Sequence, residues 1–249
     1  MSKAIVWDAE GRALDPCPAD RARRLLASGR ATLVAEEPLT IRLTRVVPLP
    51  APTRRRGAAP VRYDGQRLLL HTCCGPCATY TVGHLRAAGY ILTGYWFNPN
   101  IHPSAEHDRR RESFGRFAAA VELPVLWEPG YALAEFLRLV APNPERPTRC
   151  RICYRLRLAC TARAAAAGGY DAFSTTLLIS PYQDLDAIRQ IGEEEGAAHG
   201  VRFHYENLRS GFAERSRLAR EYGLYLQRYC GCVYSEWERS RRESAGERR

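Results

Sequence analysis

Seven of the cysteines in this chain fall into three short, spaced groups whose chemistry suits metal binding or redox work. They are Cys73, Cys74 and Cys77, the C-x-x-C pair Cys150 and Cys153, and the C-x-C pair Cys230 and Cys232. The chain holds nine cysteines, an odd number that fits simple disulfide pairing poorly. In a reducing compartment, thiols at such spacings are more often metal ligands or catalytic groups than structural disulfides.

One metal centre can be assembled from two of these groups. Thiolates are soft ligands that select zinc or an iron–sulfur cluster. We expect the ligands to be Cys73, Cys74, Cys150 and Cys153. Zinc sites usually take two C-x-x-C knuckles, but here adjacent cysteines with diverging side chains replace one knuckle. That geometry suits the wider cube of a cluster, so the sequence favours iron–sulfur over zinc. Cys77 could join this site or a second one.

The C-x-C pair allows two interpretations. With Gly231 between them, Cys230 and Cys232 could close a strained disulfide, and strained disulfides suit redox cycling. The same thiolates could instead bind a second metal. Cys17 and Cys160 lie outside the spaced motifs and are predicted to be ordinary buried thiols.

Two loops carry polar side chains that could meet a substrate. They contribute the candidates Asn98, His102, Ser174, Thr175 and Thr176. A hydroxyl-rich loop at the carboxyl edge of a parallel sheet can hydrogen-bond a polar ligand, although such loops also commonly cap helices. Tyr182, or His102, is a candidate proton donor.

The elements that must position these residues alternate between strand and helix. Strands are predicted at 67–72, 91–97, 124–127 and 172–174, and helices at 78–88, 104–121, 133–140, 150–167 and 183–194. This alternation predicts an α/β fold: a three-layer, Rossmann-like parallel sheet with helices on both faces. Gly75-Pro76 breaks the first strand, so the first cysteines lie at a strand-to-helix turn. There the positive helix end favours thiolate over thiol.

The main domain is predicted at 61–238. Before it, residues 1–48 are expected to form a small basic α+β module, with strands at 5–7, 32–35 and 39–47 and a helix at 18–28. A Pro- and Arg-rich linker at 49–60 joins the two. Residues 239–249 form a charged tail that is expected to be disordered or a frayed helix end.

The formal net charge is +10 and the pI is about 9.4. Almost every basic residue is arginine, so biased codon usage is one explanation of the positive charge. A polyanionic partner such as nucleic acid is an equally good one. Tyrosines and arginines interleave over 209–234, which suits either stacking on unpaired bases or a helix that packs its tyrosines.

No stretch approaches 18 uncharged apolar residues and the N-terminus lacks a signal-peptide core, so a cytoplasmic protein without a membrane-spanning helix is expected.

Six segments of the main domain resemble, in the expected order, the cobalamin-independent epoxyqueuosine reductase family. They are LLHTCCGPC (69–77), FNPNIHP (97–103), RCRICYRLR (149–157), FSTTLLISPYQ (173–183), GF (211–212) and YCGC (229–232). The resemblance covers roughly residues 66–238. It implies a substrate, tRNA that bears epoxyqueuosine at the wobble position. The implied reaction removes the epoxide oxygen with two electrons and two protons, leaving queuosine and water.

Cofactor roles also follow from this resemblance. It implies that Cys73, Cys74, Cys150 and Cys153 hold a [4Fe–4S] cluster. Cys230 and Cys232 would be a redox-active disulfide or ligands of an additional mononuclear iron, with Cys77 as a further ligand. An external donor, such as a reduced ferredoxin, would supply electrons. Two alternatives stay open: a zinc-stabilised RNA-binding protein without catalysis, and a metal-free thiol–disulfide oxidoreductase.

The N-terminal module resembles the RRXRR segment of transposon-encoded RNA-guided nucleases. The matching stretches are VWD (6–8), GRALDP (11–16), RARRLL (21–26), SGRA (28–31) and LTIRL (39–43). The resemblance implies an RNA-binding accessory, and no nuclease motif follows it. We therefore expect the module to add affinity for tRNA.

Overall fold

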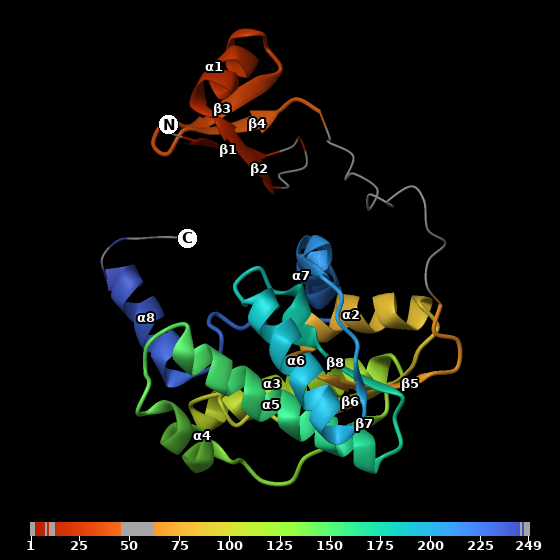
Figure 1. The fold of residues 1–249 in the computed structure, drawn as a ribbon. Helices are drawn as coiled ribbons and strands as arrows, with labels where there is room; N and C mark the ends of the chain where they lie inside the picture. Colours follow the sequence, from red (N-terminus) through yellow and green to blue (C-terminus); the bar gives the residue numbers. More distant parts are fainter. Residues whose placement is uncertain (1–2, 8, 10–12, 46–61, 245, 247–249) are drawn as a thin grey trace. The chain divides into compact units, whose positions relative to one another are not determined.

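The computed structural model describes residues 3–7, 9, 13–45, 62–244 and 246 (Figure 1). Contacts along the chain divide it into two compact units, Met1–Gly57 and Ala58–Arg249. The boundary falls in the stretch 46–61, so the linker predicted at 49–60 lies outside the described residues.

The smaller unit is a four-stranded sheet with one helix. Its elements are β1 (Lys3–Trp7), β2 (Ala13–Pro18), α1 (Ala19–Ala27), β3 (Ala31–Ala35) and β4 (Thr40–Leu43), and the strand order is β2-β1-β4-β3. β2 was not predicted, because its prolines disfavour strand; an edge position in the sheet tolerates them. Ala22 of α1 and Ile41 of β4 are fully buried in its core, and Cys17 is buried as expected.

Five parallel strands form the sheet of the larger unit. They are β5 (Arg67–His71), β6 (Ile91–Trp96), β7 (Val125–Trp127), β8 (Ala172–Thr175) and β9 (Arg202–Phe203). Their order is β7-β6-β5-β8-β9, and every neighbouring pair is parallel. From β5 the chain adds β6 and then β7 on one side. It then crosses to the other side of β5, where it adds β8 and β9. In open α/β sheets ligands bind at such a switch point, beyond the carboxyl ends of the two strands.

Helices cover both faces of this sheet (Figure 1). Leu68 and Leu70 face a core built with α2 (Gly75–Ala87), α3 (Ser104–Ala120) and α7 (Phe212–Glu221). Leu69, between them, faces the opposite core with α5 (Thr148–Ala167) and α6 (Leu185–His199), as strand alternation requires. α4 (Leu133–Val140) packs against α5. The three-layer α/β prediction is confirmed.

Gly75 and Pro76 form the first turn of α2, so the helix begins three residues before the predicted start at 78. Proline is well suited to the first turn because its missing N–H would have no partner in the helix. A side chain at Gly75 would approach the carbonyl oxygen of Ser113 to 2.9 Å, so glycine allows α2 to lie close to α3. Cys74 is the N-cap residue, which puts the cysteines directly at the helix N-terminus.

Two C-terminal helices, α7 and α8 (Val233–Ser244), follow the last strand; a helix was one of the two interpretations of 209–234. The tail expected from residue 239 is helical as far as Ser244; Arg239 and Glu243 form an i,i+4 pair within it. Residues 245 and 247–249 of that tail lie outside the described residues. In the part of the chain that the structure describes, none of the helices is long and apolar enough to cross a membrane.

Candidate active site

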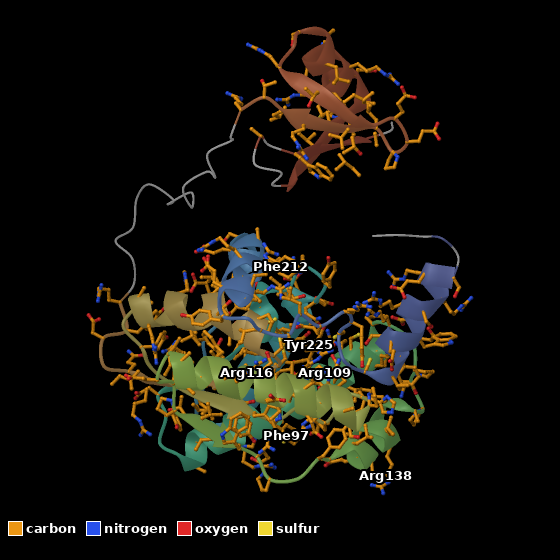
Figure 2. The ribbon with its side chains drawn as sticks, turned by 180° about the vertical axis from the view of Figure 1, so that it is seen from behind. Phe97, Arg109, Arg116, Arg138, Phe212 and Tyr225 are labelled. Atoms are coloured by element: carbon orange, nitrogen blue, oxygen red, sulfur yellow. The ribbon has the colours of Figure 1, made fainter. Side chains whose placement is uncertain are left out.

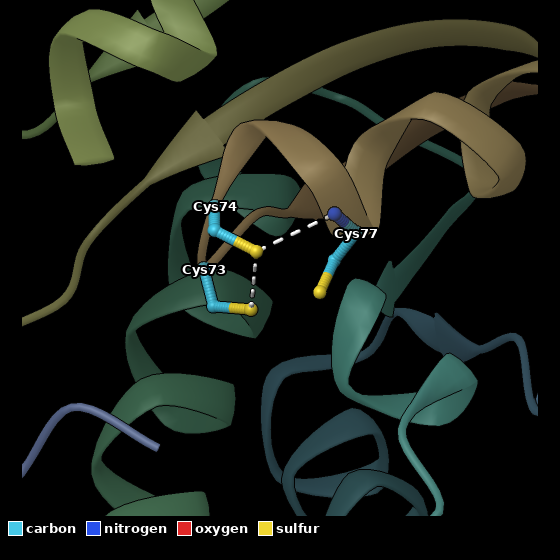
Figure 3. Close-up of side chains that lie close together, drawn as sticks. All are labelled: Cys73, Cys74 and Cys77. Atoms are coloured by element: carbon cyan, nitrogen blue, oxygen red, sulfur yellow. Dashed lines mark hydrogen bonds between the residues drawn. The ribbon is translucent and has the colours of Figure 1, made fainter. Parts of the chain in front are cut away.

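Three thiols meet where β5 gives way to α2. The sulfur atoms of Cys73, Cys74 and Cys77 lie within 4.8 Å of one another (Figure 3). Cys74 Sγ accepts the backbone N–H of Cys77 at 3.4 Å and lies 3.9 Å from Cys73 Sγ. Gln227, from the segment between α7 and α8, donates its amide N–H to Cys74 Sγ at 3.0 Å. We call Cys73, Cys74 and Cys77 the first thiol group.

The three thiols differ in acidity. Hydrogen bonds from Cys74 and Cys77 lower the pKa of Cys73 well below its usual range. Burial raises the pKa of Cys74 to about 12, and the pKa of Cys77 is raised by its hydrogen bonds to Cys73 and Cys74. Cys73 is therefore the member of the group whose thiolate form is most favoured, and a metal that binds the group would displace the protons held by its thiols.

Thr176 connects the two strands that flank the switch point. It begins the short 3-10 turn Thr176–Ile179 after β8. Its hydroxyl oxygen accepts the backbone N–H of Cys73 at 3.2 Å, and its O–H donates to Cys73 Sγ at 3.5 Å. One side chain thus fixes both the backbone and the sulfur of the first cysteine.

His71 lies beneath this group and is neutral. It is fully buried, and burial together with the charge of Arg157 lowers its pKa to about 4. Its Nε2 lies 3.2 Å from the carbonyl oxygen of Phe97, which can only accept, so Nε2 carries the proton. Nδ1 then accepts from the hydroxyl of Thr175 at 2.8 Å.

Four further cysteines surround a second, smaller hollow. Its lining includes Cys150, Cys153, Cys230 and Cys232. The hollow has a volume of about 20 Å³, which suits one ion or water rather than a larger group. Asn100 also lines it, and the buried Oδ1 of Asn100 has no hydrogen-bond partner among the described residues. We call these four cysteines the second thiol group.

No disulfide joins Cys230 and Cys232: all nine cysteines are free thiols, which corrects the disulfide expected from the C-x-C spacing. The two side chains have different surroundings. Cys230 is exposed and accepts a hydrogen bond from Gln183 at 3.5 Å. Cys232 packs against the apolar cluster that contains Phe136 and Cys153.

The first thiol group opens into a cavity of about 560 Å³, a size that suits a nucleoside-like ligand. Cys73, Cys77, Thr176 and Cys230 line it, and α8 forms part of its wall. Its charged lining is mostly positive, with Arg110, Arg146, Arg215, Arg228, Arg239 and Arg242 against Glu238 and Glu243. Such a lining favours an anionic partner.

The predicted substrate residues and the candidate proton donor Tyr182 divide into two sets. Thr176 and Tyr182 line the cavity; Tyr182 is 55% exposed and contacts Phe212 edge to face. The others are bonded into the fold. The hydroxyl of Ser174 donates to the carbonyl oxygen of His204, and the amide of Asn98 donates to that of Thr72, both at 2.8 Å.

His102 holds two loops together rather than lining the cavity. Its backbone N–H donates to the carbonyl oxygen of Gly231 at 2.8 Å, and its own carbonyl accepts from the hydroxyl of Tyr229. Tyr225 is likewise engaged, with its hydroxyl on Glu106 at 2.8 Å and Arg109 over its ring (Figure 2). Tyr225 and Tyr229, two of the four tyrosines in the segment 209–234, therefore pack against the fold.

Sequence reasoning missed several residues of the site, namely Arg110, Arg157 and Gln227. Arg110 is 1% exposed, pairs with Glu106 at 2.7 Å and donates to the carbonyl oxygens of Tyr229 and Cys230, both at 3.1 Å. It thus anchors the C-x-C turn to α3. Local spacing could not have identified Arg110 or Gln227 as site residues, because the contacts that bring them to the site, Arg110 with Cys230 and Gln227 with Cys74, join positions more than 100 apart in the chain.

Comparison with known proteins agrees with this geometry. The family model "Epoxyqueuosine reductase QueH" matches residues 68–238, and the model "RRXRR protein" matches residues 4–54. The curated epoxyqueuosine reductase QueH of Dehalococcoides mccartyi is 40% identical over 173 residues, covering 70% of this chain and 94% of that protein. The one from Thermotoga maritima is 36% identical over 180 residues, covering 69% and 91%. This chain therefore belongs to the epoxyqueuosine reductase QueH family.

Proposed function

We propose that this protein reduces epoxyqueuosine in the wobble position of tRNA to queuosine. The observation that carries the proposal is the first thiol group, which lies at the switch point of the sheet and opens into a positively lined cavity of nucleoside size. Opening of the epoxide and loss of its oxygen as water consume two electrons and two protons. The site must therefore bind an anionic substrate, receive electrons and deliver protons.

The donor set fits an iron–sulfur cluster, because thiolates are the usual ligands of such clusters. We propose that Cys73, Cys74 and Cys77 hold a [4Fe–4S] cluster, since the space beside them is large, and that the second thiol group holds a single additional iron. The ligand set Cys73, Cys74, Cys150 and Cys153 remains the competing prediction. A bound cluster would supply single electrons, and a reduced ferredoxin or similar carrier would replenish them.

The residues of the chain have separate tasks in this proposal. The arginines of the cavity bind the phosphates that flank the modified nucleoside. Tyr182 lines the cavity with its ring beside Phe212 and is the candidate proton donor at the epoxide oxygen. Gln183 and Cys230 meet at the cavity wall, which puts a thiol on the substrate side of the second thiol group.

Anaerobic purification followed by iron, sulfide and zinc analysis with a visible spectrum tests the cofactor. About four irons with matching sulfide per chain, and one further iron, are expected. Cys77→Ser and Cys150→Ser separate the two ligand sets: the first should lower sulfide content, the second only the extra iron. Turnover of epoxyqueuosine-bearing tRNA by the loaded protein then tests the reaction. A colourless protein that binds zinc and cannot take up iron and sulfide would indicate a zinc-stabilised RNA-binding protein instead.

A further inference from the structure

Arg157 is a buried cation that the proposed reaction does not use. It lies on α5, one turn after Cys153, and is 1% exposed. Its Nε donates to the carbonyl oxygen of Cys153 at 3.2 Å. Its Nη2 is buried without a hydrogen-bond partner, and no carboxylate within the described ranges forms an ion pair with it.

Arg110 shows how this fold treats a buried guanidinium when a carboxylate compensates it. Arg110 is also 1% exposed, but it pairs with Glu106 and donates to two backbone carbonyls. A buried charge that lacks such a partner is strongly destabilising. The folded chain therefore needs a negative charge beside Arg157. Among the described side chains around it, only cysteines, as thiolates, can supply that charge.

The surroundings of Arg157 identify where that anion lies. Arg157 lines the second hollow together with the second thiol group. Arg157 is also held against Cys153, a member of that group, by the hydrogen bond from its Nε one turn along α5. The guanidinium is thus positioned to act on the second thiol group.

We propose that Arg157 is the counter-charge for the metal–thiolate centre that the second thiol group holds, and that it raises the affinity of that group for iron and the reduction potential of the bound iron. This inference rests on the proposed function. Several thiolates around iron carry net negative charge, and reduction adds one more negative charge. A fixed, desolvated cation beside them favours both binding and reduction. Arg157 is a positioning residue here, because it acts through the metal centre and not on the substrate.

This role predicts opposite effects in the two states of the protein. Without metal, the buried guanidinium is poorly compensated, so Arg157→Met should leave thermal unfolding unchanged or raise its midpoint. With iron and sulfide reconstituted, the same variant should bind metal more weakly. Its reduction should also be at least about tenfold less favourable, a shift of about 59 mV for one electron toward lower potential. Arg157→Lys should recover part of the potential.

Arg163→Met is the matched control, since Arg163 is an exposed arginine two turns of α5 away. Its potential should match the wild type. The inference is overturned if Arg157→Met and Arg163→Met have the same potential. It is also overturned if Arg157→Met clearly destabilises the metal-free protein, because Arg157 would then be compensated without metal.

The readouts keep this inference apart from the proposed function. If the wild type takes up iron and sulfide but does not reduce epoxyqueuosine, the proposed function fails while the potential and binding measurements still decide the role of Arg157. If the wild type takes up no metal, the proposed function and the role of Arg157 both fail. The unfolding of the metal-free variants then shows how the fold tolerates the buried guanidinium charge of Arg157.

Discussion

Thr176 is the side chain on which the position of the first cysteine most depends. Removing its hydroxyl in Thr176→Val takes away the acceptor for the backbone N–H of Cys73 and the donor to its sulfur. We expect metal affinity or turnover to fall about 10- to 100-fold, as is typical when a group that orients a metal ligand is lost. Iron content after reconstitution and steady-state rates measure this.

Ser174→Ala is the comparison for that variant. Ser174 is equally buried, but its hydroxyl bonds to the carbonyl oxygen of His204. The Ser174→Ala variant should lose about 1–3 kcal/mol of folding free energy and keep its iron content. If Ser174→Ala lowered iron content as much as Thr176→Val, the hydroxyls would act through general stability only.

Glu206 gives the fold a pH dependence that is separate from the site. The rings of His204 and His84 lower its pKa from 4.5 to about 2, and Glu206 in turn raises the pKa of His84 above 6.5. A lowered carboxyl pKa stabilises the fold above pH 4.5, and this contribution is lost as pH falls toward 2. A raised histidine pKa stabilises it below pH 6.5, and this is lost as pH rises through the raised value.

The two pH ranges overlap, and the overlap predicts where the stability of Glu206→Gln differs most from that of the wild type. The loss should be greatest between pH 4.5 and 6.5, and about 0.5–1 kcal/mol, since the pair is partly exposed and screened by solvent. Denaturant unfolding at several pH values measures it. Glu193→Gln, at an exposed i,i+4 pair, should change stability by less than about 0.5 kcal/mol. A pH-independent loss in Glu206→Gln would contradict the ion-pair explanation.

At the scale of elements, the turn at Gly231 positions the C-x-C thiols. Its φ is +133°, and a side chain there would come within 3.1 Å of Ile101 and 3.2 Å of Asn100. Gly231→Ala should therefore displace the second thiol group and lower its iron content and turnover by about tenfold or more. Gly130 also has positive φ, +80°, but open space around it. Gly130→Ala should cost about 1–2 kcal/mol and leave iron content intact; equal iron loss in both would contradict the steric argument.

The elements show why sequence predicts this fold better than its site. Leu68, Leu69 and Leu70, followed by cysteines, sufficed to predict a buried strand that ends at a ligand-binding edge. Which hydroxyl reaches the cavity depends instead on where β8 stops: Ser174 and Thr175 are still in the strand, whereas Thr176 has entered the turn. Local sequence cannot fix that boundary to one residue. Nor can it pair Gln227 with Cys74, because only the packing of α7 brings them together.

For the molecule as a whole, the smaller unit carries charge that the reaction at the larger unit does not require. Among the described residues of this unit, the exposed arginines are Arg21, Arg23, Arg24, Arg30, Arg42 and Arg45. Since the RRXRR match covers this unit and tRNA is a polyanion, we propose that it adds phosphate contacts to tRNA binding. The proposal concerns affinity only, because the cavity and both thiol groups lie within Ala58–Arg249.

Deleting residues 1–60 tests this division of labour. Each phosphate contact contributes about 0.9 to the slope of log K against log salt, so loss of two or three contacts should lower the slope by about 2–3. Turnover at saturating tRNA should persist. The two relatives compared above are matched over nearly their whole length by the larger unit, which leaves little room in them for such a module. Arg21→Gln, Arg23→Gln and Arg24→Gln together in the full chain should reproduce part of the change in slope without removing the fold of the module. An unchanged slope and affinity after deletion would mean that the arginines of the smaller unit do not contact tRNA, and that its partner is another molecule.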